Sequence, residues 1–369
     1  MLISFGIAKL FMSTLLSITP CKPSFAVRAR EDTFQNSSPF EISTFLVEKF
    51  LNKATNKKNI MFDQISKEIR ETISNYSRED SLIFNNKVIK INQDNFNEMI
   101  PNEGKTIAFV DGGQAEIIST GNFCLSFIRI FAQVFQDNKK LKPYKKEFYL
   151  FTKARWHNEE LVYESKIFGD KNIDENDLLI SSNDSTIKSG IERAPIAKVA
   201  NMARRFAELN LAAEVNAKMV VLDGTLEPSY NHEEKYLTNL DNNVAALAKS
   251  SSLFTSSGNS PVVLLNKLFQ GKWSYFVDGK TYFVKLHDLA KHVFRYEGKK
   301  EYLSYLVSNC NDALFLGYPY GLIFVDRMAR VSNSEKNSLK MKFLLNKENK
   351  EVVDYLTTSN AHEILDNLG

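Results

Sequence analysis

Two short apolar runs that each end in Asp-Gly constrain the fold of this chain more than any other feature. The run Ile-Ala-Phe-Val ends at Asp111 and the run Val-Val-Leu ends at Asp223, with glycine after each aspartate. Continuous apolar runs of this length are typical of strands buried on both faces of an α/β sheet. Asp-Gly is also the commonest turn dipeptide, but a buried strand that ends in a carboxylate is a usual way to build a site. We therefore predict an α/β fold with Asp111 and Asp223 as candidate site residues.

The remaining pattern predicts a mixed sheet flanked by helices. We expect the first strand to stop at Asp111 and to turn on Gly112 and Gly113, and a β-meander to follow it. The meander strands are predicted at Ala115 to Ser119, Phe123 to Val134 and Glu147 to Lys153. A polar excursion, a helix and the second buried strand are predicted at Gly169 to Ser189, Ile191 to Ala217 and Lys218 to Leu222.

The C-terminal half is predicted to be mostly helical around one hairpin. A hairpin is indicated by strands Ser274 to Val277 and Thr281 to Leu286 around Asp278-Gly279. Apolar spacing predicts helices at Asn231 to Lys249, Pro261 to Phe269, Glu301 to Cys310 and Leu322 to Val331.

The N-terminal region is predicted to be a helical extension covering residues 1–100, with helices at 41–51 and 61–76. The apolar opening, residues 1–25, raises the alternative of a signal peptide. It lacks a basic segment before the apolar run, and Lys9 interrupts that run. A peripheral helix, or an upstream choice of start codon, is therefore favoured over a signal peptide.

Composition excludes several classes of protein without identifying a partner. The chain has 369 residues, 43% of them hydrophobic and 25% charged, with a net charge of +3. Such a composition is that of a soluble globular protein and excludes collagen-like, polybasic and largely disordered chains. The three cysteines are far apart, which favours a reducing, cytoplasmic location over a disulfide framework. No apolar stretch is long enough to predict a membrane span.

Two further acids fall within helical patterns. Glu208 lies at the edge of the apolar stripe of its predicted helix, and Asp326 interrupts an otherwise apolar helix. Burying an unpaired carboxylate is costly, so Asp326 needs either a shared cation or an ion pair with Arg327 or Arg330. Clustered carboxylates are the ligands that Mn²⁺ and Mg²⁺ prefer, and two such ions can catalyse cleavage of a phosphodiester. Asp on a strand, Glu on a helix, Asp on a later strand and an acid on a C-terminal helix form the order of ribonuclease-H-like nucleases.

Four segments together resemble the motifs of the NurA nuclease family. They are Ile107-Ala-Phe-Val-Asp-Gly-Gly113, Arg204-Arg-Phe-Ala-Glu-Leu209, Val220-Val-Leu-Asp-Gly-Thr-Leu226 and Gly317-Tyr-Pro-Tyr-Gly-Leu-Ile-Phe-Val-Asp-Arg-Met-Ala329. The resemblance implies a ribonuclease-H-like core over residues 101–335, between the N-terminal extension and a C-terminal tail at 336–369. It also implies a homodimer that cleaves DNA as a Mn²⁺-dependent 5′-to-3′ exonuclease and single-strand endonuclease. Its implied partner in DNA-end resection and repair is the hexameric HerA ATPase.

By matched position, the resemblance implies that Asp111, Glu208 and Asp223 hold the metal and that Tyr318 lines the site. Asp326 would complete or border that site. The chain departs from the family pattern at Gly113, where serine is frequent, and at Gly321, where proline is usual. Asp326 stands where the family commonly has histidine, and a carboxylate can bind Mn²⁺ but cannot act as a neutral imidazole base.

Weaker candidates remain open at this stage. Lys249 resembles a lysine of the family that could meet a phosphate, but a helix-terminal lysine is an equal alternative. Arg295 and Glu297 are expected to form surface ion pairs, and the histidines are assigned no metal. The function predicted is a Mn²⁺- or Mg²⁺-dependent nuclease acting on single- and double-stranded DNA. A non-catalytic DNA-binding or assembly subunit of the same ATPase complex, and an enzyme that acts on RNA, are the alternatives.

Overall fold

The protein was analysed as a computed structural model that describes residues 61–73, 80–249, 253–313 and 315–359. The chain separates into two units, Met1–Asn75 and Tyr76–Gly369, and the fold below is that of the second. In the first unit, residues 61–73 are helical, within the helix expected at 61–76. The other N-terminal expectations, for residues 1–25 and 41–51, lie outside the described residues.

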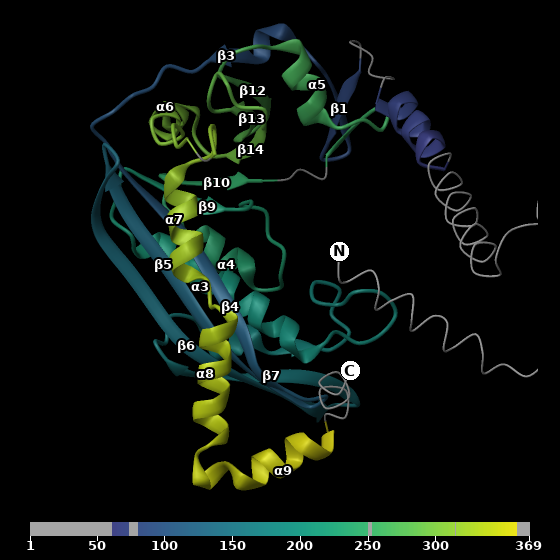
Figure 1. Ribbon diagram of the computed structural model, residues 1–369, viewed down its shortest axis with the longest axis vertical. Coiled ribbons are helices and arrows are strands. Elements are labelled where there is room, and N and C mark those ends of the chain that lie inside the picture. Colours follow the sequence, from purple (N-terminus) through teal and green to yellow (C-terminus); the bar gives the residue numbers. More distant parts are fainter. Residues whose placement is uncertain (1–60, 74–79, 250–252, 314, 360–369) are drawn as a thin grey trace, which may run out of the picture. The chain divides into compact units, whose positions relative to one another are not determined.

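The second unit is built on an eleven-stranded mixed sheet in the order β3-β12-β13-β14-β10-β9-β4-β5-β6-β7-β8 (Figure 1). Its strands are β3 (Phe96–Glu98), β4 (Thr106–Ser119), β5 (Phe123–Gln136), β6 (Lys139–His157), β7 (Glu160–Gly169), β8 (Ile180–Ser181), β9 (Met219–Asp223), β10 (Val244–Ala248), β12 (Trp273–Asp278), β13 (Thr281–Lys285) and β14 (Phe294–Glu297). A separate three-stranded sheet contains β1 (Ser81–Phe84), β2 (Lys87–Lys90) and β11 (Phe254–Thr255).

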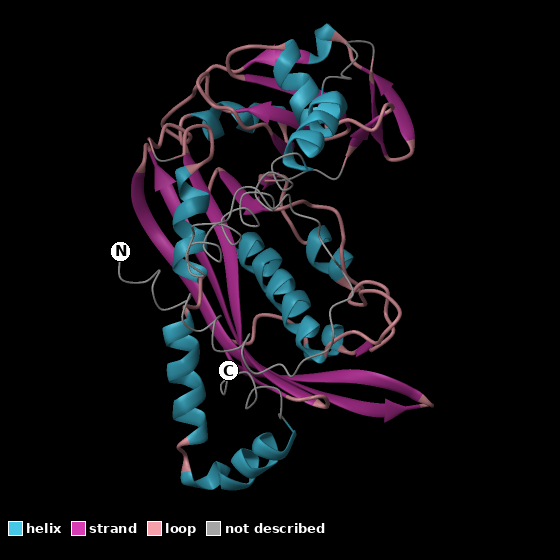
Figure 2. Ribbon diagram, turned by 45° about the vertical axis from the view of Figure 1, so that its right-hand side comes forward, coloured by secondary structure: helices cyan, strands magenta, loops and turns pink. Residues whose placement is uncertain are grey.

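The centre of the large sheet has the ribonuclease-H-like arrangement that we predicted. Strands β4, β5 and β6 form an antiparallel meander, and β9 and then β10 continue the sheet parallel to β4. Figure 2, in which strands are magenta, shows the long strands of the meander. Strand β4 therefore lies between an antiparallel neighbour, β5, and a parallel neighbour, β9. This position puts the end of β9 beside the middle of β4.

The helices of the second unit are α3 (Val199–Glu214), α4 (Glu233–Thr238), α5 (Pro261–Leu268), α6 (Leu303–Val307), α7 (Tyr320–Ala329), α8 (Asn333–Leu344) and α9 (Lys350–Ser359). Helices α3 and α7 cover the two faces of the centre of the sheet. Alternate residues of β4 enter two separate cores, Ala108 and Val110 with α3, and Ile107 and Phe109 with α7. Short 3₁₀ turns occur at Gln93–Asn95, Glu175–Leu178, Ile196–Lys198, Lys300–Tyr302 and Lys347–Asn349. None of the helices in the described part of the chain combines the length and hydropathy that crossing a membrane requires.

Strand β4 corrects the prediction that the first strand stops at Asp111. It continues through Gly112 and Gly113 to Ser119, so the predicted strand at 115–119 is its second half. The two glycines are not turn residues, and neither has a positive φ. They are sites where other elements approach the strand closely, as the site geometry below shows.

Strand β10 corrects the prediction of one helix from Asn231 to Lys249. Only Glu233–Thr238 is helical, and the run Val-Ala-Ala-Leu-Ala at 244–248 is a strand buried along its whole length. A continuous apolar run rich in alanine suits a buried helix as well as a strand between two neighbours, and pairing with β9 and β14 decides the outcome.

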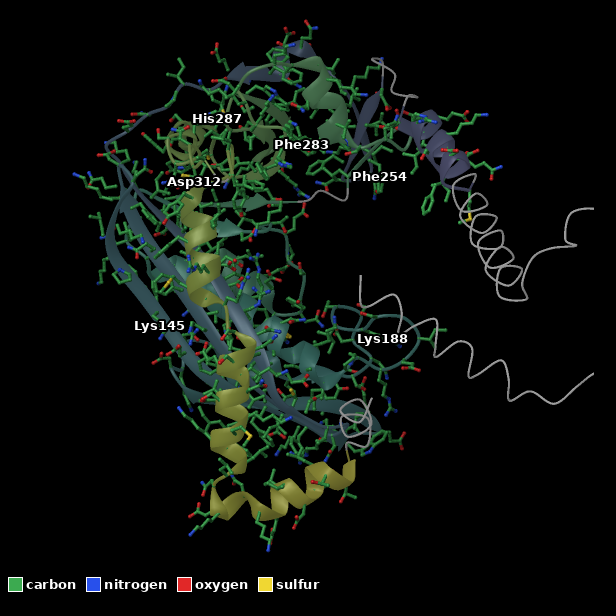
Figure 3. The ribbon with its side chains drawn as sticks, in the orientation of Figure 1. Lys145, Lys188, Phe254, Phe283, His287 and Asp312 are labelled. Atoms are coloured by element: carbon green, nitrogen blue, oxygen red, sulfur yellow. The ribbon has the colours of Figure 1, made fainter. Side chains whose placement is uncertain are left out.

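The predicted hairpin is present, whereas residues 81–98 are not helical as expected, and helices occur within the expected C-terminal tail. Strands β12 and β13 pair antiparallel, and Phe283, labelled in Figure 3, lies fully buried in their core. Residues 81–98, expected within the helical extension, form β1, β2 and β3. Residues 333–344 and 350–359, mostly within the expected tail, form α8 and α9, and α8 packs on an apolar patch of β4 and β5.

Candidate active site

Three adjacent parallel strands bring the first candidate residues together. Strands β4 and β9 are in register up to the pair Val110 and Leu222, so Asp111 and Asp223 follow side by side. Strand β10 pairs with β9 up to Asp223, and Lys249 comes directly after its last residue. Neighbouring strands lie about 4.8 Å apart. Asp111 and Asp223 are therefore neighbours, as the nuclease hypothesis requires.

A pocket of about 320 Å³ opens beside these strands and contains Glu208 as well. The helix α3 supplies Glu208 and two arginines, and the segment after β9 supplies the rest of the wall. The lining residues are Asp111, Arg204, Arg205, Glu208, Asp223, Gly224, Thr225, Ser229 and Tyr230. Three of the predicted acids thus share one pocket.

Glu208 reaches the pocket because Gly112 has no side chain. A β-carbon on Gly112 would lie 2.5 Å from Oε1 of Glu208 and 2.9 Å from Cγ of Arg204. Arg204 Nη1 donates to Glu208 Oε1, one turn away on α3, and to the carbonyl oxygen of Gly112 at 3.1 Å. Glu208 is almost fully buried, so this ion pair offsets part of the cost of removing its charge from water.

The buried acids repel one another in the absence of a bound cation. Burial raises the pKa of Asp111 to about 7, and the charges of Glu208 and Asp223 add to this effect. The N–H of Gly112, which donates to Asp111 at 2.7 Å, and the charge of Arg204 oppose it. Burial also raises the pKa of Glu208, although Arg204 counteracts it. A pair of acids shifted in this way is typical of a functional site.

Lys249 is the basic partner of Asp223. Its Nζ donates to Asp223 Oδ2 at 2.5 Å and lies 5.5 Å from the centre of the Tyr318 ring. Burial opposes the charge of Lys249, but the Asp223 carboxylate outweighs this effect and the pKa of Lys249 is raised. Lys249 follows a strand, so the alternative of a helix-terminal lysine does not apply.

Tyr318 is buried next to the acids with an unsatisfied hydroxyl. The ring packs against Phe294 and Phe315, with centroids 5.2 and 5.8 Å away. Its oxygen has no hydrogen-bond partner within the part of the chain that the structure describes. Burial, followed by the charges of Asp223 and Asp111, raises its pKa, so the hydroxyl keeps its proton and remains a potential donor.

Asp326 does not line the pocket. Its Oδ2 accepts from Arg330 Nη2 at 2.7 Å, one turn along α7, and its side chain is 41% exposed. This is the ion-pair alternative that the sequence left open. Asp326 is still near enough for its charge to raise the pKa of Tyr318 and Lys249, so it borders the site.

The two departures from the family motif at glycine positions have a steric reason in this chain. A β-carbon on Gly113 would lie 2.2 Å from the carbonyl oxygen of Ala329, and one on Gly321 would lie 2.0 Å from the Phe109 ring. Helix α7 therefore approaches β4 closely at both of its ends. Serine at position 113 and proline at position 321 do not fit this packing.

The chemistry of the donors fits a hard divalent cation, but the side chains are not arranged around one. Asp111, Glu208 and Asp223 supply only carboxylate oxygens, and a cation would neutralise the negative charge of Glu208 and Asp223 that adds to burial in raising the pKa of Asp111. Among the described residues, no group of three or more His, Cys, Asp or Glu side chains has the arrangement of a metal site. Arg204 and Lys249 instead pair with Glu208 and Asp223.

Sequence reasoning missed the residues that shape the pocket around the acids. Arg205 and Tyr230 line it, and Glu233 bonds to the Arg205 side chain and to the backbone N–H of Tyr230. The spacing of Arg204 and Glu208, four residues apart on a helix, is a sequence signal that could have indicated their ion pair. The expectation of surface pairs at Arg295 and Glu297 was wrong about their location. Both side chains are buried and bonded to each other, because β13 and β10 enclose their strand.

Solved structures of other proteins are similar to this chain in fold, whereas the sequence comparisons find no match. No protein-family profile and no curated protein sequence matches the chain. A crystal structure of the NurA nuclease from Sulfolobus solfataricus matches it with a TM-score of 0.46 and 13% identity, over 82% of this chain and 98% of that one.

Two other structures illustrate the range of the likeness. The catalytic domain of human endonuclease V matches with a TM-score of 0.33 and 10% identity, over 66% of this chain and 92% of that one. The Argonaute of A. aeolicus matches with a TM-score of 0.29 and 14% identity, over 62% of this chain and 29% of that one. In fold, this chain is similar to the NurA nuclease, whose family motifs its sequence resembles.

Proposed function

We propose that this protein is a metal-dependent nuclease that hydrolyses phosphodiester bonds of DNA. The observation that carries the proposal is the meeting of Asp111, Glu208 and Asp223 in one pocket of about 320 Å³. These residues come from a strand, a helix and a second strand that are far apart in sequence. Burial, with the charges of Glu208 and Asp223 added to it, raises the pKa of Asp111 to about 7, and shifted acids of this kind cluster at functional sites.

In this proposal the three carboxylates hold one or two Mn²⁺ or Mg²⁺ ions. When bound, such an ion polarises the phosphodiester and lowers the pKa of a water molecule. Asp223 must exchange its bond with Lys249 for one to the cation, which leaves the ammonium group free to meet a phosphate oxygen. The hydroxyl of Tyr318, which has no partner among the described residues, can donate a hydrogen bond to the same phosphate.

The resemblance of the four motifs to the NurA family supports a finer proposal. The protein would act as a 5′-to-3′ exonuclease and single-strand endonuclease, as a homodimer with a HerA-type hexameric ATPase, in DNA-end resection and repair. We also propose a cytoplasmic location, which the three widely spaced cysteines favour. Asp326 is outside this catalytic set, because it is paired with Arg330.

The proposal is tested by cleavage of labelled single-stranded DNA, double-stranded DNA and RNA with Mn²⁺, with Mg²⁺ or with EDTA. Asp111→Asn, Glu208→Gln and Asp223→Asn should each abolish cleavage while the far-UV spectrum stays that of a folded protein. Asp354→Asn, which changes an exposed aspartate of α9, is the matched control.

Cleavage by folded Asp111→Asn and Asp223→Asn at the rate of the unmodified chain would refute the nuclease assignment. Tight binding of DNA without any cleavage would instead favour the non-catalytic subunit of the ATPase complex. Faster cleavage of RNA than of DNA would show that the substrate is RNA, while the assignment of the active site would stand.

A further inference from the structure

Residues 224–232, between β9 and α4, form one wall of the pocket. Hydrogen bonds to two buried ion pairs hold this segment in place, which is unusual for a surface loop. Four of its residues, Gly224, Thr225, Ser229 and Tyr230, line the pocket. Connecting segments of this kind are usually mobile and exposed, because few buried groups hold them. Two buried ion pairs hold this one from different elements.

The first ion pair joins Arg205 of α3 to Glu233 of α4. Glu233 has no exposed surface, and its Oε1 accepts from Arg205 Nε at 2.7 Å. Its Oε2 accepts from the backbone N–H groups of Ser229 and Tyr230 at 2.7 and 3.0 Å. Arg205 Nη2 also donates to the carbonyl oxygen of Thr225 at 2.6 Å. Three backbone groups of the wall are thus bonded to one buried pair.

The second ion pair joins Arg295 and Glu297 of β14. Both side chains are buried, with Arg295 Nη2 and Glu297 Oε1 2.8 Å apart. Glu297 Oε2 accepts from the backbone N–H of Leu226 at 2.7 Å, and Arg295 pairs with Glu227. Burying ion pairs carries a large desolvation cost, so their presence on both sides of a short segment points to a need for fixed geometry.

The Arg205–Glu233 pair holds the backbone at Tyr230, and the Arg295–Glu297 pair holds the same wall at Leu226 and Glu227. Tyr230 is the one aromatic residue among the described residues that line the pocket. Its ring is half-buried and meets Phe206 of α3 edge-on, with centroids 6.4 Å apart. Three carboxylates that would hold a cation facing a phosphate, beside one aromatic ring, offer a nucleotide two kinds of contact, one for its phosphate through the cation and one for its base.

We propose that Tyr230 is a specificity-determining residue that stacks on the base next to the scissile phosphate of a single-stranded substrate. The inference rests on the proposed nuclease function and adds to it the residue that contacts a base of the single-stranded substrate. A base inside a duplex is covered by its neighbours on both faces, whereas a base in a single strand can stack on an aromatic side chain. The Arg205–Glu233 pair acts through Tyr230 and is a positioning element.

The proposal is tested by binding, so that it does not depend on catalysis. The affinity of a fluorescein-labelled single-stranded dodecamer is measured by anisotropy in EDTA for the full chain. Tyr230→Ala should weaken binding by roughly 10- to 100-fold, the loss expected for one base–aromatic stack. Tyr230→Phe, which keeps the ring, should bind within about 3-fold of the unmodified chain.

An abasic dodecamer separates stacking from other contacts of the tyrosine. It has the same phosphates but no bases, so Tyr230→Ala and the unmodified chain should bind it equally. The matched control is Trp156→Ala on β6, because Trp156 is a 62% exposed aromatic residue outside the pocket. That variant should bind both oligonucleotides as the unmodified chain does.

The positioning role is tested by a double-mutant cycle. Glu233→Gln should weaken binding of the base-bearing dodecamer, and the same change in a Tyr230→Ala background should add nothing. If Glu233→Gln does not fold, Glu297→Gln serves in its place, since it loosens the wall at Leu226. Additive effects of the two changes would overturn the positioning role.

The outcomes distinguish the two proposals. Unchanged affinity of Tyr230→Ala for the base-bearing dodecamer, in a chain that cleaves DNA, overturns the stacking role and leaves the nuclease assignment intact. Equal weakening on the abasic dodecamer also overturns it. Loss of affinity in a chain that cleaves nothing supports stacking while the nuclease assignment fails.

Discussion

A β-carbon placed on Gly113 would lie 2.2 Å from the carbonyl oxygen of Ala329, the last residue of α7. The backbone of the central strand and the end of the helix are therefore in direct contact. Because α7 follows Tyr318 and carries Asp326, this contact fixes how the C-terminal motif meets the sheet.

Gly113→Ser should destabilise the protein. The added side chain must push α7 away from β4, and overpacking of this kind costs about 1–3 kcal/mol in the free energy of unfolding. Urea unfolding measures the change. Gly121→Ser is the control, since a β-carbon there meets no atom within 4 Å. Equal stability of the two variants would show that α7 is not held against Gly113.

The stability of the metal-free protein should depend on pH through Asp111. Its pKa is about 7 in the folded chain against 3.8 as the reference value, so the folded state binds the proton more tightly. The contribution of Asp111 to the free energy of unfolding is complete below pH 3.8 and is lost as the pH rises towards 7. Each unit of pKa difference corresponds to about 1.4 kcal/mol.

Asp111→Asn should therefore flatten the pH profile of stability between pH 4 and 7, and be more stable than the unmodified chain at pH 8 in EDTA. Thermal unfolding across pH measures this. Asp354→Asn, on the exposed side of α9, should keep the original profile. A profile that does not change in Asp111→Asn would contradict the burial of an acid at this position.

Lys249→Ala should strengthen the binding of Mn²⁺. A cation that binds Asp223 must displace the Lys249 ammonium, and an ion pair with a lysine that is 53% exposed is worth about 0.2–1 kcal/mol. Isothermal titration should show roughly 1.5- to 5-fold tighter binding. Lys272→Ala, which breaks a comparable pair with Asp288, is the control and should leave the affinity unchanged. Weaker binding in Lys249→Ala would show that the lysine does not compete with the metal.

Asp326→Asn should reduce cleavage far less than Asp223→Asn. Asp326 is paired with Arg330 outside the pocket, whereas Asp223 lines it. Mutation of a residue that only orients a metal ligand lowers activity by about 10- to 100-fold, and mutation of a ligand itself should lower it further. We expect less than about 10-fold for Asp326→Asn and more than about 100-fold for Asp223→Asn, measured as kcat/KM on single-stranded DNA. Equal losses would bring Asp326 into the catalytic set.

The sequence by itself determined that Asp111 and Asp223 follow buried apolar runs and are candidate site residues. The apolar runs before Asp111 and Asp223 are short, rich in β-branched residues and followed by glycine, which favours strands over helices. The hairpin of β12 and β13 was equally clear from its turn residues. Glu208 could be singled out because its helix has a marked apolar stripe.

Only the tertiary structure decided what surrounds these residues. The glycines after Asp111 suggested a turn, but they are the places where Glu208 and Ala329 approach the strand. The run at 244–248 suggested a helix until pairing with β9 and β14 made it a strand. The ion pair of Arg205 with Glu233 and the bond of Leu226 to Glu297 join residues 28 and 71 positions apart. Local patterns report the preferences of neighbouring residues, whereas close approach and buried ion pairs depend on which distant segments meet.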